Sequence, residues 1–232
     1  MKGSIYLLPV TLGGKDFSQV IPSAVLDITR ELRLFIVEDI RSARRYLRLI
    51  DKQFPINDTT FLELNEHTSD KDVSALLEPV LNGSDCGVMS EAGQPGIADP
   101  GTRVVALAHL KGIRVIPMSG PSSIILALIS SGLTGQQFTF NGYLPVKTEA
   151  RAARVRELEK KAGEGYTQIF METPYRAGKI ADTLLSVCKN DTLLCIASDI
   201  TLETEWIKTR RIVEWRRNPP EIDGKLVIFL LK

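Results

Sequence analysis

Met89-Ser-Glu-Ala-Gly-Gln-Pro-Gly-Ile-Ala-Asp-Pro-Gly101 is the stretch of this 232-residue sequence that decides its fold. A hydrophobic run precedes it and a helical pattern follows it, so we interpret it as the loop between a strand and a helix. Open α/β sheets bind ligands at the carboxyl ends of their strands, and glycines allow close backbone approach. The stretch matches neither GxGxxG nor a P-loop. An ordinary Gly/Pro-rich connection is the alternative interpretation.

Strand-like and helix-like patterns alternate around this loop in the first half of the chain. The expected strands cover residues 4–10, 33–37, 61–64, 85–89 and 113–117. The expected helices cover residues 19–31, 39–52, 71–81 and 102–111. This order predicts a mostly parallel sheet with helices on both faces.

The pattern changes after the turn Ser119-Gly120-Pro121. Expected helices follow at 122–131, 148–162 and 176–187, with strands at 138–143, 167–172 and 192–198. Residues 205–209 and 225–231 are expected to form neighbouring antiparallel strands. We therefore predict an α/β fold of two α/β domains, residues 1–118 and 119–232.

Composition narrows the function classes. The 29 basic residues nearly cancel the 28 acidic ones, so a nucleic-acid partner requires a local basic patch. Residues 1–10 lack the pattern of a signal peptide, and no run of about 18 apolar residues occurs, so we expect a cytoplasmic protein without a membrane partner. The three cysteines suit buried free thiols. His67 and His109 have no partner at metal-ligand spacing, so we expect no metal site.

Two further loops close predicted strands. Val115-Ile-Pro-Met-Ser-Gly-Pro-Ser-Ser123 leads into a helix N-terminus, where free N–H groups favour an anionic or polar ligand. Ser122 or Ser123 as a simple helix cap is the alternative. Leu8-Pro-Val-Thr-Leu-Gly-Gly14 ends the first strand. We expect the three loops to line one crevice.

The quoted stretches carry a family resemblance. Ser90 to Gly101 resembles the S-D-A-G-x-P-x-I-S-D-P-G signature of the ribosomal-RNA small-subunit methyltransferase I family, within the tetrapyrrole methylase superfamily. Gly120-Pro-Ser-Ser123 and Asn141-Gly-Tyr-Leu-Pro145 resemble its G-P-S/C and G-F-L-P elements in the same order. The likeness continues through residues 37–41, 169–176, 200–209 and 224–231 and so covers nearly the whole chain.

The resemblance implies two α/β domains of the tetrapyrrole-methylase type with S-adenosylmethionine in a cleft between them, in a homodimer. Transferred by position, the implied cofactor contacts are Leu12, Ala92, Gly93, Gln94, Ile97, Ser122, Ser123, Met171, Glu172, Ala197 and Ile200. The family's first loop reads P-x-G-N where this chain has Thr11-Leu-Gly-Gly14, and Ile40 replaces a threonine. These departures bear on the substrate more than on the cofactor.

Glu38 and Asp39 follow the second predicted strand. Methylation of a ribose hydroxyl requires its proton to leave, so carboxylates at this edge are the candidate catalytic groups. By family position both face the substrate. The alternative is that they complement the N-terminus of the following helix.

That helix places four arginines, Arg41, Arg44, Arg45 and Arg48, opposite an apolar face. The arginines suit successive RNA phosphates, and a solvated charged face is the alternative. A second basic cluster, Lys147, Arg151, Arg154 and Arg156, extends this track in the same hypothesis. Tyr143, Tyr175 and Trp206 are candidates for base stacking, with core packing as the alternative.

The leading hypothesis is 2'-O-ribose methylation of small-subunit ribosomal RNA, with that RNA or the small ribosomal subunit as the partner. A methyltransferase of the same class acting on a tetrapyrrole or another small molecule is the first alternative. It predicts an apolar cleft and no dependence on the arginine helix. A non-catalytic relative that binds the cofactor or RNA is the second, and it predicts salt-sensitive RNA binding without methyl transfer.

Overall fold

The computed structural model describes residues 1–65 and 67–232. The chain divides into two compact units, Met1–Ser122 and Ser123–Lys232. The predicted domain boundary lay after Met118, in the same connection. Among the described residues, no helix is both long enough and apolar enough to cross a membrane.

The N-terminal unit is built on an all-parallel sheet of five strands in the order β3-β2-β4-β1-β5. The first strand, β1, lies next to β4, the strand that leads into the Met89–Gly101 stretch. The strands are β1 (Ser4–Leu7), β2 (Leu34–Val37), β3 (Thr60–Glu63), β4 (Cys86–Met89) and β5 (Arg114–Pro117). The predicted parallel sheet is confirmed.

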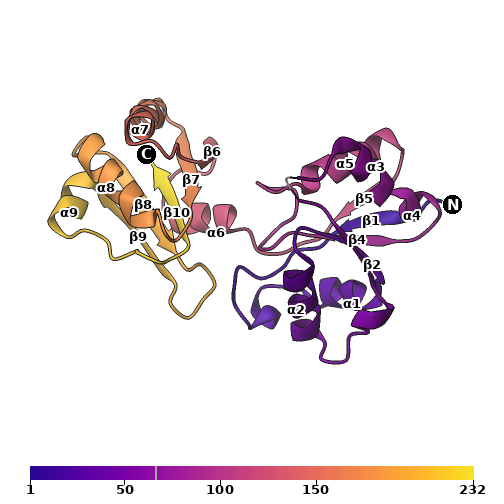
Figure 1. Ribbon diagram of the computed structural model, residues 1–232. Coiled ribbons are helices and arrows are strands. Elements are labelled where there is room, and N and C mark those ends of the chain that lie inside the picture. The colour runs from indigo at the N-terminus through magenta and orange to yellow at the C-terminus, as the bar shows by residue number, and fades with distance from the viewer. Residues whose placement is uncertain (66) are drawn as a thin grey trace. The chain divides into compact units, whose positions relative to one another are not determined.

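Helices cover both faces of this sheet (Figure 1). The helices are α1 (Ser23–Glu31), α2 (Ile40–Ile50), α3 (Asp70–Leu76), α4 (Glu78–Leu81) and α5 (Gly101–Leu110). On one face Phe35 and Val37 pack with residues of α1 and α2. On the other, Ile36 and Val88 pack with residues of α3, α4 and α5. The alternation of side chains along each strand therefore supplies two separate cores.

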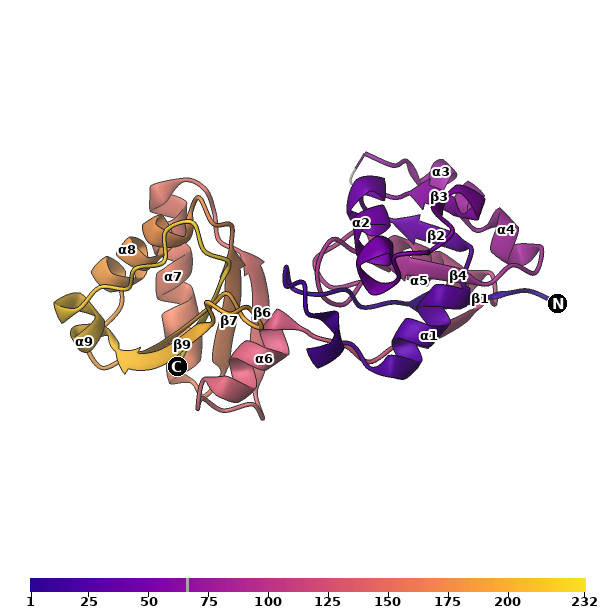
Figure 2. The same cartoon turned by 90° about the horizontal axis from the view of Figure 1, so that it is seen from below.

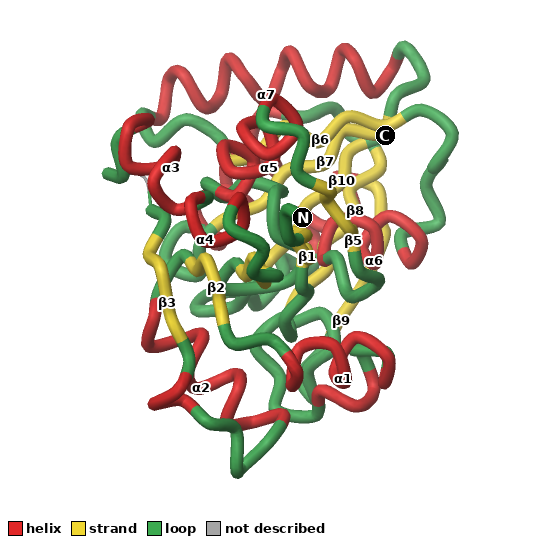
Figure 3. The backbone as a smooth tube through the Cα atoms, turned by 90° about the vertical axis from the view of Figure 1, so that its right-hand side faces the viewer, coloured by secondary structure: helices red, strands yellow, loops and turns green. Residues whose placement is uncertain are grey.

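The C-terminal unit has a mixed sheet of five strands in the order β6-β7-β10-β8-β9. Its elements are α6 (Ser123–Ser130), β6 (Phe138–Tyr143), α7 (Thr148–Gly163), β7 (Thr167–Glu172), α8 (Ala177–Val187), β8 (Leu193–Ser198), β9 (Trp206–Arg211), α9 (Ile212–Arg217) and β10 (Val227–Leu231). Figure 2 shows α6 on the opposite side of this sheet from α8 and α9. In Figure 3 the strands β6, β7, β10 and β8 follow one another as yellow neighbours.

Three predictions of local structure were wrong. Residues 205–209 and 225–231 are not neighbouring strands, because β8 lies between β9 and β10 and pairs antiparallel with both. The expected helix 71–81 is two helices that meet at Leu77, since Pro79 lacks the N–H that a helix interior needs. The expected helix 19–31 begins only at Ser23, after Pro22, because proline disfavours helical geometry at the residue before it.

Trp215 anchors α9, a helix that the sequence did not predict. Its side chain is buried, and Nε1 donates a hydrogen bond of 2.9 Å to the Leu194 carbonyl of β8. The ring also makes an edge contact with Trp206, with 5.8 Å between the ring centroids. These contacts hold α9 against the sheet.

Replacing Trp215 by Phe removes the side-chain hydrogen bond to the Leu194 carbonyl and leaves part of the buried ring's space unfilled. We expect a loss of about 1–3 kcal/mol in the free energy of unfolding. Trp206→Phe is the matched control and costs less, because this ring is only half-buried. Both tryptophans lie in the C-terminal unit, so denaturant unfolding followed by the remaining tryptophan's fluorescence reports on that unit alone. Equal losses in the two variants contradict the anchoring role.

Candidate functional site

In the signature loop, residues 90–101 between β4 and α5, the Asp99 side chain closes a tight turn. Asp99 accepts hydrogen bonds from the backbone N–H of Gly96 (2.7 Å) and of Gly101 (2.6 Å). The backbone has positive φ at Gly93 (69°), Gly96 (87°) and also at Ala98 (60°). A non-glycine residue in this conformation is strained, and such strain persists where the surrounding structure determines it. Sequence reasoning missed Asp99, although the Asp-Pro-Gly sequence was a visible sign of a tight turn.

The three predicted loops meet at the carboxyl edge of the parallel sheet. The Val10 N–H donates to the Gly93 carbonyl (2.9 Å), and the two residues form an antiparallel bridge. Gln94 Nε2 donates to the Met118 carbonyl at 3.2 Å. The loops after β1, β4 and β5 therefore contact one another, whereas the crevice that they are expected to line stays a prediction.

Glycines make this close approach possible. A Cβ on Gly120 would lie 2.2 Å from Cβ of Pro9, so only glycine fits there. A Cβ on Gly93 would lie 3.1 Å from Leu12 and 3.4 Å from the Pro121 carbonyl oxygen. The loops after β1 and β5 thus enclose Gly93 from both sides. We call this contact region the loop junction.

The cofactor residues expected in the N-terminal unit lie in or beside the loop junction. Leu12 and Gly93 are buried, whereas Ala92 is exposed and Ile97 is 46% exposed. Gln94 uses its amide to hold the loop after β5. The two serines lie at the end of this connection, Ser122 as the last residue of the N-terminal unit and Ser123 as the first residue of α6. The exposed surface of the junction is therefore mostly backbone and apolar side chains.

Glu38 lies at the carboxyl end of β2, beside the signature loop. Its Oε2 accepts a hydrogen bond of 3.2 Å from the Glu91 N–H. Burial raises the pKa of Glu38, and the nearby carboxylates of Glu91, Asp99 and Asp39 raise it further, while the bond from the Glu91 N–H opposes them. A carboxyl group with a raised pKa is a better proton acceptor when ionised.

Asp39 has a different environment from its neighbour. It is the N-cap of α2, and its carboxylate accepts a hydrogen bond from the Ser42 N–H at 2.7 Å. Hydrogen bonds from Ser42 lower the pKa of Asp39. The alternative weighed for this residue, a role at the helix N-terminus, is what the structure shows.

The second unit holds the remaining expected cofactor residues. Met171 of β7 and Ala197 of β8 both pair with Ile228 of β10, so they flank it in one row across the sheet. The Glu172 side chain is fully buried, with Oε2 3.0 Å from an Arg176 guanidinium nitrogen and Oε1 accepting from the Thr173 N–H at 2.8 Å. Its charge is thus compensated inside this unit.

Ile200 lies in the loop after β8, whose backbone is also unusual. Asp199 and Thr201 on either side of it have φ values of 52° and 70°. Asp199 accepts hydrogen bonds from the Thr204 hydroxyl (2.9 Å) and from the Leu226 N–H (3.3 Å). These bonds determine the strained conformation, and Ile200 itself is buried.

The four arginines of α2 are all exposed, as the sequence predicts. Arg44 stacks on the Phe61 ring, 5.2 Å from its centroid, and Arg45 donates to the Ser42 hydroxyl at 3.1 Å. Arg48 donates to the Lys52 carbonyl. None of the four arginines forms an ion pair with any described residue, so the helix keeps its positive charge.

The second basic cluster is available to a partner only in part. Arg151 is buried, and its guanidinium donates to the Thr183 hydroxyl (2.9 Å) and the Val146 carbonyl (2.9 Å). Arg154 is paired with Glu157, which is also 3.0 Å from Lys161. Only Lys147 and Arg156 of this cluster are exposed. The helical pattern of the sequence alone did not show that Arg151 is buried while Arg156 is exposed.

The candidate stacking residues differ among themselves. Tyr175 is 93% exposed and Tyr143 is 54% exposed, whereas Trp206 packs against Trp215.

The three cysteines are buried free thiols, as predicted. Burial raises the pKa of both Cys86 and Cys188 to about 12, which makes them poor nucleophiles. No group of three or more potential metal ligands occurs among the described residues.

Comparisons with known proteins agree with this architecture. The family described as Tetrapyrrole (Corrin/Porphyrin) Methylases matches residues 22–214. A ribosomal RNA small subunit methyltransferase I from Vibrio cholerae is 30% identical over 211 residues, which are 90% of this chain and 69% of that protein. The protein of the same name from Haemophilus influenzae is 28% identical over 234 residues, which are 99% of this chain and 79% of that protein.

Two solved structures have the same fold. The crystal structure of the methyltransferase CobJ matches with a TM-score of 0.64 at 16% identity, covering 98% of this chain and 93% of that one. The uroporphyrin III C-methyl transferase from Thermus thermophilus matches with a TM-score of 0.59 at 14% identity, covering 98% and 97%. Since the family match spans most of both units and curated relatives align over nearly the whole chain, this protein belongs to the tetrapyrrole methylase family and is a methyltransferase.

Proposed function

We propose that the protein uses S-adenosylmethionine to methylate a ribose 2'-hydroxyl in small-subunit ribosomal RNA. The observation that carries this proposal is the loop junction, where three strand-end loops converge on Gly93 beside an ionisable carboxyl group. The relatives named as ribosomal RNA small subunit methyltransferases support the choice of RNA. The two solved structures support the fold and carry no inference about the substrate.

The residues of the loop junction fit this cofactor. Exposed Ala92 and Ile97 offer apolar contacts, and the glycine-rich backbone offers N–H and C=O groups. When bound, S-adenosylmethionine supplies a methyl group on a positively charged sulfur. The contacts assigned to Met171, Glu172, Ala197 and Ile200 stay predictions, and so do the homodimer and the cytoplasmic location.

Glu38 is the proposed proton acceptor. A ribose hydroxyl is a weak nucleophile, and its proton must move to a base as the new C–O bond forms. Burial and nearby carboxylates raise the pKa of Glu38, whereas hydrogen bonds to Ser42 lower the pKa of Asp39. Of the two carboxylates proposed as catalytic, we therefore assign proton acceptance to Glu38, whereas Asp39 caps the helix that carries the arginines.

The α2 arginines are the proposed first contact with RNA. Arg41, Arg44, Arg45 and Arg48 follow Glu38 directly in the chain and lie on the exposed side of α2. Guanidinium groups bind phosphate oxygens through paired hydrogen bonds. Phosphates held there bring an RNA chain toward the carboxyl edge of the sheet, where Glu38 lies.

The cofactor assignment is tested by calorimetric titration with S-adenosylmethionine, followed by labelled methyl transfer to small ribosomal subunits that lack the modification. We expect binding and transfer. Gly93→Ala should weaken binding roughly tenfold or more, because the added Cβ enters the loop junction. Gly132→Ala is the matched control, since Gly132 has nearly the same φ (71°) but open space around it. An unmodified protein that does not bind S-adenosylmethionine overturns the proposal.

Glu38→Gln should reduce methyl transfer by roughly 10²–10⁴-fold while S-adenosylmethionine binding stays near normal. Because the proton acceptor must be ionised, transfer by the unmodified protein should fall as pH decreases through the raised pKa of Glu38. The raised pKa also means that ionised Glu38 opposes folding at neutral pH. Glu38→Gln should therefore keep or raise the unfolding temperature at pH 7.

Asp39→Asn is the control for Glu38→Gln, since asparagine caps a helix about as well as aspartate. This variant should keep nearly full transfer and stability. Equal loss of transfer in the two variants, or full transfer by Glu38→Gln, removes Glu38 from the role of proton acceptor.

A further inference from the structure

A second concentration of positive charge lies in the C-terminal unit. Residues 206–217, which form β9 and α9, contain five cationic side chains and one acidic one. The cations are Lys208, Arg210, Arg211, Arg216 and Arg217, and the acid is Glu214. The whole chain has a formal net charge of only +1, so this β9–α9 basic segment departs strongly from the average.

Two of these arginines keep the segment rigid. Arg210 stacks on Trp215, 5.1 Å from the ring centroid. Arg216 donates to the carbonyl oxygens of Leu185 (2.6 Å) and Cys188 (2.7 Å) at the end of α8. Both contacts fix backbone and side chains without neutralising charge, since their partners are a ring and neutral carbonyls.

The other three cations, Lys208, Arg211 and Arg217, are exposed. None of the three forms an ion pair with any residue of the described part of the chain. The single acid, Glu214, accepts a hydrogen bond of 2.9 Å from the Arg211 N–H and offsets one of the five positive charges, so the segment has a formal net charge of +4 (five minus one). The segment therefore offers a large excess of positive charge on a support held by the contacts of Arg210 and Arg216.

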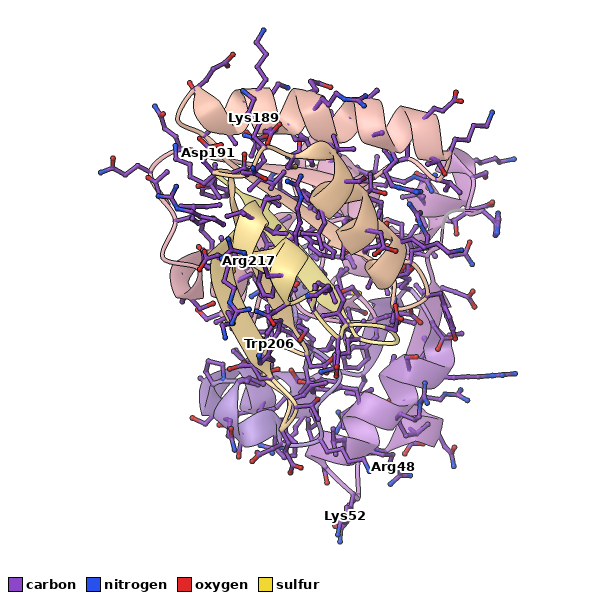
Figure 4. All side chains as sticks on the ribbon, turned by 90° about the vertical axis from the view of Figure 1, so that its left-hand side faces the viewer. Arg48, Lys52, Lys189, Asp191, Trp206 and Arg217 are labelled. Atoms are coloured by element: carbon purple, nitrogen blue, oxygen red, sulfur yellow. The ribbon has the colours of Figure 1, made fainter. Side chains whose placement is uncertain are left out.

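The segment is also open to a long partner. β9 is the edge strand of its sheet and pairs only with β8, so its other side is not covered by a strand. Figure 4 shows Trp206 and Arg217 in one view of this unit, with Lys189 and Asp191 farther along it, beyond the end of α8. Lys208 and Arg211 are about 10 Å apart along β9 and project to opposite faces of the sheet, because side chains alternate along a strand. They therefore flank the open edge of β9 from its two faces, and Arg217 adds positive charge on α9.

Protection of an edge strand against aggregation is another use of such charges, and lysine is the usual residue for that purpose. Here four of the five cations are arginine, and two of them lie beyond the strand in α9. Arginine is the residue best suited to phosphate. The second basic cluster does not present a comparable exposed charge, because Arg151 is buried and Arg154 pairs with Glu157.

We propose that the β9–α9 basic segment binds the sugar-phosphate backbone of RNA and forms a second contact surface besides α2. This inference rests on the proposed function, since it assumes an RNA substrate. It assigns to the C-terminal unit a role in substrate binding that is separate from the cofactor positions expected there.

The test compares three full-length proteins. One is unmodified, and one carries Lys208→Gln, Arg211→Gln and Arg217→Gln. The matched control carries Lys71→Gln, Arg114→Gln and Lys160→Gln, which removes the same charge from exposed positions outside the basic clusters. Binding of a fluorescent single-stranded RNA of about 20 nucleotides is measured by anisotropy over a range of salt concentrations. Tryptophan fluorescence during unfolding checks that each variant is folded.

We expect the β9–α9 variant to bind RNA roughly tenfold more weakly at low salt, with a salt slope smaller by about 2, because three phosphate contacts are lost. The control variant should bind like the unmodified protein. The proposal is overturned if the β9–α9 variant binds normally, if it only aggregates more with its affinity unchanged, or if both variants lose the same affinity. Calorimetry with S-adenosylmethionine tests the cofactor separately, so failure of the cofactor assignment is distinguishable from failure of this RNA surface.

Discussion

The Asp99 carboxylate accepts hydrogen bonds from the N–H groups of Gly96 and Gly101, and the geometry of the candidate site depends on this small turn. With the turn closed, Gly93 is presented to Val10, and Gln94 reaches the Met118 carbonyl. The loops after β1, β4 and β5 then form one surface. Hydrogen bonds to a charged group are stronger than those between neutral groups. The bonds to Asp99 therefore also help to hold the strained backbone at Ala98.

Two adjacent carboxylates acquire opposite properties from their surroundings. Glu38 is partly buried among other acids, and its pKa is raised. Asp39 faces the N-terminus of α2 with hydrogen bonds from Ser42, and its pKa is lowered. Environments that separate the pKa values of neighbouring acids commonly divide chemical roles between them. Here the division leaves one residue to accept a proton and the other to fix the helix that carries four arginines.

Much of the fold was predictable because the strands of the parallel sheet are short buried runs of apolar residues bounded by turn residues. The meeting of three loops was expected because each follows a predicted strand of a parallel sheet, although the adjacency of β4, β1 and β5 was not predicted. The arrangement of β8, β9 and β10 was not predictable, since nearness in sequence suggested pairing while the sheet inserts β8 between the other two. The role of Arg151 was also hidden, because its charge is satisfied by Thr183 on α8 and by the Val146 carbonyl, contacts that no helical pattern reveals. The site residues in the N-terminal unit came from the family resemblance, since backbone and apolar contacts leave little trace in composition.

The central claim is that the loop junction of the N-terminal unit binds S-adenosylmethionine, and amide hydrogen exchange followed by mass spectrometry tests it most directly. Exchange is measured on the full chain with and without a saturating concentration of the cofactor. Added protection should be greatest in peptides that cover residues 8–14, 90–101 and 115–122, because those backbones would contact the cofactor directly. Unchanged exchange in all three segments, with binding verified by calorimetry, would contradict the account.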